Sequence, residues 1–126
     1  MGGVALYRLR GPLRQAARVT GVYPDTWAGP RVRYLRRDCT GGLLFVDVQA
    51  DPGLIQAAQT VTAFVRGRTV ARVVLRSNES TLVAPLRPRG GTCSVDFVTS
   101  PTAVPRHGDL RRLGVHFRAL RYVPPA

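Results

Sequence analysis

Apolar and polar residues alternate along most of the chain in short runs, and each run is bounded by glycine, proline, asparagine or aspartate. Runs with a period of two, separated by turn-forming residues, are typical of half-buried β-strands. No apolar pattern of helical period lies between them, which disfavours a parallel α/β sheet. The pattern predicts eight strands, at 17–23, 31–36, 43–50, 60–66, 69–76, 81–86, 92–100 and 113–122.

The regular spacing of these strands predicts an all-β fold, an antiparallel β-sandwich of jelly-roll type that spans 17–126. Two β-branched runs around Gly67 and Arg68 predict a hairpin with a two-residue turn. A helix of one or two turns is expected at 52–59. Residues 1–16 form a basic N-terminal arm, for which an extended conformation and a short helix both remain open.

Alternation along the strands also predicts which side chains form the core. Asp47, Asp96, His116 and Arg118 fall on the outward positions of their strands. The inward positions carry Val46, Val48, Cys93, Val95, Phe97, Leu113, Val115 and Phe117.

Length and composition restrict the class of protein. A chain of 126 residues fits one domain. No run of about 18 apolar residues occurs, so no helical membrane span is expected, and residues 1–16 lack the apolar centre of a secretory signal. Ten prolines and 13 glycines argue against a helical bundle.

The formal charge of +12 arises from 19 arginines and no lysine. Two explanations remain open. One is codon usage in a GC-rich genome, and the other is an anionic partner such as a phospholipid, a polyanionic glycan or a nucleic acid. The arginines are spread along the whole chain, and no base-reading helix or base-stacking motif accompanies them. This dispersion weakens the case for nucleic acid and favours treating the charge as background.

Cys39 and Cys93 stand 54 positions apart. One pair at this spacing does not form a zinc site by itself, and neither His107 nor His116 is spaced to complete one, so no metal is expected. A disulfide is the first interpretation; two buried thiols and a reactive cysteine are the alternatives. A disulfide would indicate an oxidising, extracytoplasmic compartment.

The residues most suggestive of binding lie in two turn-rich segments. The first holds Tyr23, Asp25 and Trp27, which is the only tryptophan, and in the second Asp109 and Arg111 open the last predicted strand. Aromatic rings beside a carboxylate suit a sugar, because the ring packs on C–H groups and the carboxylate accepts hydroxyl hydrogen bonds. The structural alternative is that Trp27 caps the end of the sandwich and that the Asp–Arg pair stabilises a sheet corner.

Motifs for catalysis and for cofactors are lacking. The sequence contains no Gly-x-Ser-x-Gly, no phosphate loop, no dinucleotide fingerprint and no pair of carboxylates in one predicted loop. His107 and His116 are isolated, and a lone histidine on the polar face of a strand is expected to be solvated. The sequence therefore predicts a protein that is not an enzyme and that holds no cofactor.

Three motifs occur in a characteristic order: Gly-Val-Tyr-Pro-Asp-x-Trp from Gly21, Cys-Thr-Gly-Gly-Leu from Cys39, and Asp-x-Arg-x-Leu-Gly-Val from Asp109. In this order, over residues 18–123, the chain resembles the β-sandwich accessory modules of actinobacterial membrane glycosyltransferases and other cell-envelope polysaccharide proteins. The resemblance implies a jelly-roll module related to carbohydrate-binding modules, without catalysis, on the outer face of the membrane. By position it places Tyr23, Asp25 and Trp27 in the first loop, and Asp109 and Arg111 in the last.

The leading hypothesis is therefore a non-catalytic module of the cell envelope that binds carbohydrate or supports a glycosyltransferase. A second hypothesis is an arginine-rich protein that binds a polyanion, either nucleic acid or anionic lipid. A third is a structural or assembly subunit with a sandwich fold.

Overall fold

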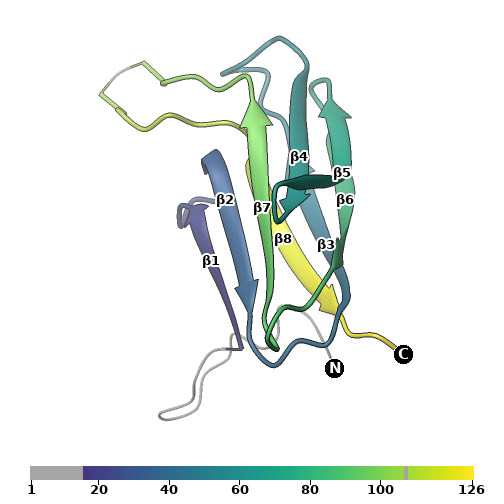
Figure 1. Ribbon diagram of the computed structural model, residues 1–126. Helices are drawn as coiled ribbons and strands as arrows, with labels where there is room; N and C mark the ends of the chain where they lie inside the picture. The colour runs from purple at the N-terminus through teal and green to yellow at the C-terminus, as the bar shows by residue number, and fades with distance from the viewer. Residues whose placement is uncertain (1–15, 107) are drawn as a thin grey trace.

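The computed structural model describes residues 16–106 and 108–126, and two antiparallel sheets face each other across one core (Figure 1). The described residues contain no helix. The five-stranded sheet has the order β1-β2-β7-β4-β5, and the three-stranded sheet has the order β6-β3-β8. The strands are β1 (Ala17–Val22), β2 (Ala28–Arg36), β3 (Gly42–Gln49), β4 (Gln59–Val65), β5 (Arg68–Leu75), β6 (Glu79–Leu86), β7 (Cys93–Ser100) and β8 (His116–Val123).

Three strand pairs are nested, and the β4–β5 hairpin is the innermost. β4 pairs with β5, β3 with β6, and β2 with β7, all antiparallel. This is the pairing of one long hairpin that has been rolled into two sheets, which is how a jelly roll is built. The fold class predicted from the sequence, an all-β antiparallel sandwich of about eight strands, is confirmed.

The core lies between the inward faces of the two sheets. The alternation predicted for β3 and β7 is confirmed, since Val46, Val48, Val95 and Phe97 are buried while Asp47 is exposed. The rings of Phe97 and Phe117 meet edge to face across the sheets, with centroids 5.6 Å apart. Burying a side chain of this size is worth roughly 1.5–3 kcal/mol, so these faces supply most of the driving force for folding.

The β4–β5 turn differs from the prediction by one residue. Val65 pairs with Arg68, so the two turn residues are Arg66 and Gly67 rather than Gly67 and Arg68. Both have positive φ, 49° and 79°, as a type I′ turn requires. Glycine fits either turn position, so the strand register decides, and it leaves Arg66 in a conformation that non-glycine residues seldom adopt.

Two further expectations are wrong in detail. The helix expected at 52–59 is a single turn, in which the amides of Leu54 and Ile55 both donate to the Asp51 carbonyl. So short a segment does not repay the cost of helix nucleation. The last strand begins at His116, because Leu113 instead pairs with Ala103 inside the preceding loop. The N-terminal arm at 1–16 lies outside the described residues, apart from its last position.

Cys39 and Cys93 form a disulfide, as the sequence analysis favoured. Their Cα atoms are 5.7 Å apart, and both residues are buried. The bond ties the segment after β2 to the first residue of β7, which already neighbours β2 in the sheet. Such a bond is consistent with an oxidising compartment.

Candidate functional site

Three connections meet at one end of the sandwich: the β1–β2 loop at 23–27, the β3–β4 loop at 50–58 and the long β7–β8 loop at 101–115 (Figure 1). Backbone hydrogen bonds join the first residue of β2, directly after the first loop, to the third loop. The amide of Ala28 donates to the Val115 carbonyl, and the amide of Gly114 donates to the Ala28 carbonyl, both at 2.9 Å. These bonds bring two of the segments singled out in the sequence into direct contact.

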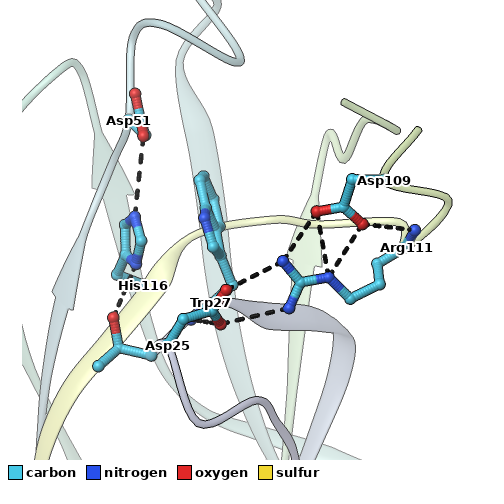
Figure 2. A network of polar contacts seen from close by, with 7 residues as sticks. Asp25, Trp27, Asp51, Asp109, Arg111 and His116 are labelled. Carbon is cyan, nitrogen blue, oxygen red and sulfur yellow. Dashed lines mark hydrogen bonds and ion pairs between the residues drawn. The ribbon is translucent and has the colours of Figure 1, made fainter. Parts of the chain in front are cut away.

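Arg111 links the β1–β2 loop to the β7–β8 loop. Its Nη2 donates to Asp25 Oδ2 at 3.0 Å and to Asp109 Oδ2 at 2.8 Å, and its Nε donates to Asp109 Oδ1 at 3.0 Å. The guanidinium also lies over the ring of Tyr23, 4.5 Å from its centroid. Figure 2 shows the guanidinium between the two carboxylates. We call Asp25, Asp109 and Arg111 the loop clamp.

The loop clamp holds its charges in the ionised state. Hydrogen bonds from Arg111 hold the pKa of both Asp25 and Asp109 below the usual range, and the two carboxylates raise the pKa of Arg111. A group whose pKa is lowered in the folded state stabilises that state above its unfolded pKa and loses this effect as pH falls. The clamp should therefore be acid-sensitive.

Replacing Arg111→Met should lower the free energy of unfolding at neutral pH, because the two carboxylates lose their shared partner. The difference from wild type should be fully present above about pH 5 and should shrink as pH falls below about pH 4, where the carboxylates protonate. Urea unfolding at several pH values measures it. The neighbouring Arg112→Met is the control, since Arg112 contacts Thr102 rather than a described carboxylate. A difference for Arg111→Met that stays constant with pH would contradict the clamp.

Trp27 is packed against His116. The two ring centroids are 3.9 Å apart and the planes are tilted by 33°. The Thr26 hydroxyl lies 2.8 Å from His116 Nδ1. On the other side of the ring, His116 Nε2 lies 3.8 Å from Asp51 Oδ2, and Figure 2 marks this contact with a dashed line. His116 takes the outward position beside buried Phe117, but the expectation that it is solvated is wrong, since only 20% of its side chain is exposed.

An open groove of about 650 Å³ runs between the three loops beside Trp27. This volume is within the range of small-ligand sites, about 300–1,000 Å³. The groove is lined by one aromatic ring, by apolar side chains, by two carboxylates and by one arginine. The lining residues that the argument uses are Trp27, Asp51, Val104, Arg106, Asp109 and Leu113.

Gln59 fixes both ends of the β7–β8 loop from inside the protein. Its side chain is fully buried, and its Nε2 donates to the carbonyls of Pro101 at 3.0 Å and Gly114 at 2.8 Å. Its Oε1 has no protein partner among the described residues. Sequence reasoning missed this residue, although a glutamine in phase with the inward positions Val61 and Ala63 is a visible signal of a buried polar role.

Replacing Gln59→Met should destabilise the protein by about 1–3 kcal/mol, because the carbonyls of Pro101 and Gly114 would be left buried without donors. Chemical denaturation measures the loss, and faster amide hydrogen exchange in the β7–β8 loop should accompany it. The exposed Gln56→Met is the matched control and should be near neutral. Equal stability of both variants would contradict the anchoring role.

The five residues proposed from the sequence, Tyr23, Asp25, Trp27, Asp109 and Arg111, all lie at this end of the sandwich. Their roles differ: Arg111 is occupied by its two carboxylates, whereas Trp27 and Asp109 border the groove. Sequence reasoning missed Asp51, Arg106 and His116, whose place at the site depends on contacts between loops far apart in the chain.

Two other features, a metal-binding cluster and a membrane-spanning helix, are not found among the described residues. Within residues 16–106 and 108–126, no three His, Cys, Asp or Glu side chains gather so that they could hold a metal ion. Over the same residues, no helix has the length and apolar character needed to cross a membrane.

No protein-family model matches the sequence, and no curated protein matches it. The fold is similar to part of a Clostridium perfringens ZmpB structure described as CBM51-2 in complex with GlcNAc and INT domains, with a TM-score of 0.49 and 13% identity. That match covers 78% of this chain but 21% of the other, so the chain spans about a fifth of that protein's length.

Two smaller proteins are similar over most of their length. One is CsCBM6-3 from Clostridium stercorarium in complex with cellobiose, with 10% identity, a TM-score of 0.39, and coverage of 90% of this chain and 86% of that one. The other is CBM35 from Cellvibrio japonicus Abf62, with 13% identity, a TM-score of 0.44, and coverage of 85% and 78%. At these identities, and with TM-scores below one half, the likeness concerns the sandwich fold alone.

Proposed function

We propose that the protein is a non-catalytic carbohydrate-binding module whose ligand occupies the groove between the three loops. The observation that carries the proposal is the placement of Trp27 on the same groove as the carboxylates of Asp51 and Asp109. An indole presents an apolar face to sugar C–H groups, while carboxylates accept hydrogen bonds from sugar hydroxyls. Arg106, also on the groove, supplies donors for sugar oxygens.

The loop clamp supports this proposal by holding the groove in shape before a ligand arrives. Arg111 joins the loop that carries Trp27 to the loop that carries Asp109. A preformed groove avoids the entropy cost of ordering loops on binding. Asp25 and Arg111 therefore hold the two loops in position, and the ring of Tyr23 packs against the guanidinium of Arg111.

The pKa of Asp109 argues against this residue as the general acid of a glycosidase. A glycosidase needs one carboxyl group with a raised pKa to act as general acid. Hydrogen bonds from Arg111 instead lower the pKa of Asp109. A carboxylate with a lowered pKa is suited to accepting hydrogen bonds from a sugar.

The proposal extends to the setting of the module. The disulfide suits an oxidising compartment, and the motif order at Gly21, Cys39 and Asp109 resembles accessory modules of cell-envelope glycosyltransferases. We place the module in the cell envelope, where it would hold a polysaccharide near a membrane glycosyltransferase.

A glycan array that carries neutral oligosaccharides of glucose, galactose, mannose and arabinose tests the binding function. The wild-type protein should bind at least one class, and calorimetric titration of that class should give a saturable heat. A folded protein that gives neither an array signal nor a titration heat with these ligands would overturn the proposal.

A further inference from the structure

A second concave site lies at the other end of β7, away from the loop groove. A cleft of about 230 Å³ is lined by four arginines, two hydroxyl side chains and one carboxylate. We call it the arginine cleft, and its residues are Arg33, Arg66, Arg87, Arg89, Thr92, Ser94 and Asp96. Figure 1 shows that the β6–β7 loop, which carries Arg87 and Arg89, and the β7–β8 loop lie at opposite ends of β7.

Within its described residues, the protein neutralises only one of the four arginines of the cleft. Arg33 pairs with Asp96, with its Nε donating to Oδ1 at 2.7 Å and its Nη2 donating to Oδ2 at 3.2 Å. No carboxylate of the described residues pairs with Arg66, Arg87 or Arg89. Three like charges around one small cavity repel one another, and a bound anion would remove that repulsion.

Hydrogen bonds and the disulfide hold the backbone around Arg89 in place. Arg89 and Thr92 exchange two backbone hydrogen bonds, of 2.8 and 3.2 Å, around the glycines at 90 and 91. The Cys39 amide donates to the Gly91 carbonyl at 2.8 Å, and the disulfide fixes Cys93 next to Thr92. The β6–β7 loop is thus fastened to the segment after β2, which reduces the ordering cost of binding an anion.

Arg66 lines the cleft from a separate segment of the chain, the β4–β5 turn. It occupies the first position of the two-residue β4–β5 turn with φ of +49°, where asparagine or glycine is the usual choice. Unusual backbone conformations of this kind persist where the surrounding structure determines them. Here the turn brings Arg66 to the same cleft as Arg87 and Arg89.

Charge also gathers on the adjoining outer face of the five-stranded sheet. The strand register places Arg31 and Arg33 of β2 and Arg72 of β5 on the positions opposite the core. The outer face of the three-stranded sheet instead places Asp47 and Glu79 beside Arg118. Arg31, Arg33 and Arg72 therefore share one face of the sheet, next to the arginine cleft.

We infer that the arginine cleft binds one phosphate or sulfate group, either free or carried by a larger ligand. Guanidinium groups form paired hydrogen bonds with such oxyanions, and the hydroxyls of Thr92 and Ser94 offer further donors. The cleft has room for a tetrahedral oxyanion with a small part of the molecule that bears it. This inference goes beyond carbohydrate binding and does not depend on the loop groove.

Titration of the full chain with inorganic phosphate and sulfate at low ionic strength, followed by NMR, tests this site. The test variant is the triple change Arg66→Gln, Arg87→Gln and Arg89→Gln. The control removes the same charge elsewhere, by Arg76→Gln, Arg118→Gln and Arg121→Gln. Phosphate affinity should fall about tenfold or more in the test variant and less than about twofold in the control, as lost charge-assisted hydrogen bonds would require.

Two further probes identify the source of the oxyanion: a short sulfated dextran, and phosphatidylglycerol vesicles compared with phosphatidylcholine vesicles. Binding that depends on the cleft arginines supports the inference for whichever probe shows it, and binding of phosphate alone assigns the free ion. Equal loss in both triple variants would show a diffuse charge effect and would overturn the inference. Failure of the wild type to bind phosphate or sulfate saturably would overturn it as well.

Discussion

Removing the disulfide by Cys39→Ala and Cys93→Ala together is expected to lower the free energy of unfolding by about 4 kcal/mol. The bond closes a loop with a sequence separation of 54, and the unfolded chain without it gains the corresponding conformational freedom. Both cysteines are buried against the core, so alanine avoids leaving a polar group without a partner there. A domain of this size has a total stability of about 5–15 kcal/mol, so the loss is a large part of it.

Urea unfolding of the double variant beside oxidised wild type measures this loss. Wild type unfolded in the presence of reductant should lose a similar amount, which separates the effect of the bond from that of the alanines. The Cα distance of 5.7 Å shows that the two positions suit a bond without backbone movement. Stability of the double variant within about 1 kcal/mol of oxidised wild type would contradict the role given to the disulfide.

Replacing Trp27→Ala should weaken carbohydrate binding by roughly 30- to 150-fold, which corresponds to the loss of about 2–3 kcal/mol of apolar contact. The reason is that Trp27 forms the aromatic edge of the loop groove, whose remaining walls are shorter apolar side chains and charged groups. Trp27→Phe keeps an aromatic ring and should retain much of the affinity. Calorimetric titration with the oligosaccharide selected on the array measures both variants.

Two controls separate binding from folding in this experiment. Trp27 also packs on His116, so the thermal unfolding of Trp27→Ala must be followed beside its affinity. Phe64→Ala removes a half-buried ring from the outer face of the five-stranded sheet, away from the groove, and should leave affinity unchanged. Unchanged affinity in folded Trp27→Ala would remove the indole from the binding site.

The sequence predicts this fold well because alternation reports directly which side of a strand is buried. Val46, Asp47 and Val48 show the principle, since the two valines are in the core and the aspartate between them is exposed. Details that depend on pairing between strands are harder to predict. The turn at Arg66 and Gly67 is an example, because the local sequence permits two registers and the partner strand selects one.

The candidate site could be predicted only in pieces. Trp27 and Asp25 are neighbours in the sequence, and an aromatic ring beside a carboxylate in a turn is a visible signal. Their contact with Arg111 depends on two backbone bonds between Ala28 and the segment at 114–115, which no local pattern encodes. The arginine cleft was missed for the same reason, since its four arginines come from three separate segments.

The most direct test of carbohydrate binding at the loop groove uses the fact that Trp27 is the only tryptophan. Its indole N–H gives a single NMR signal that reports on one wall of the groove. Titration of the wild-type protein with the array-selected oligosaccharide should shift this signal saturably, together with the amides of Gly53, Ala103 and Val104. A saturating oligosaccharide that leaves the indole signal and these amides unmoved would contradict the account.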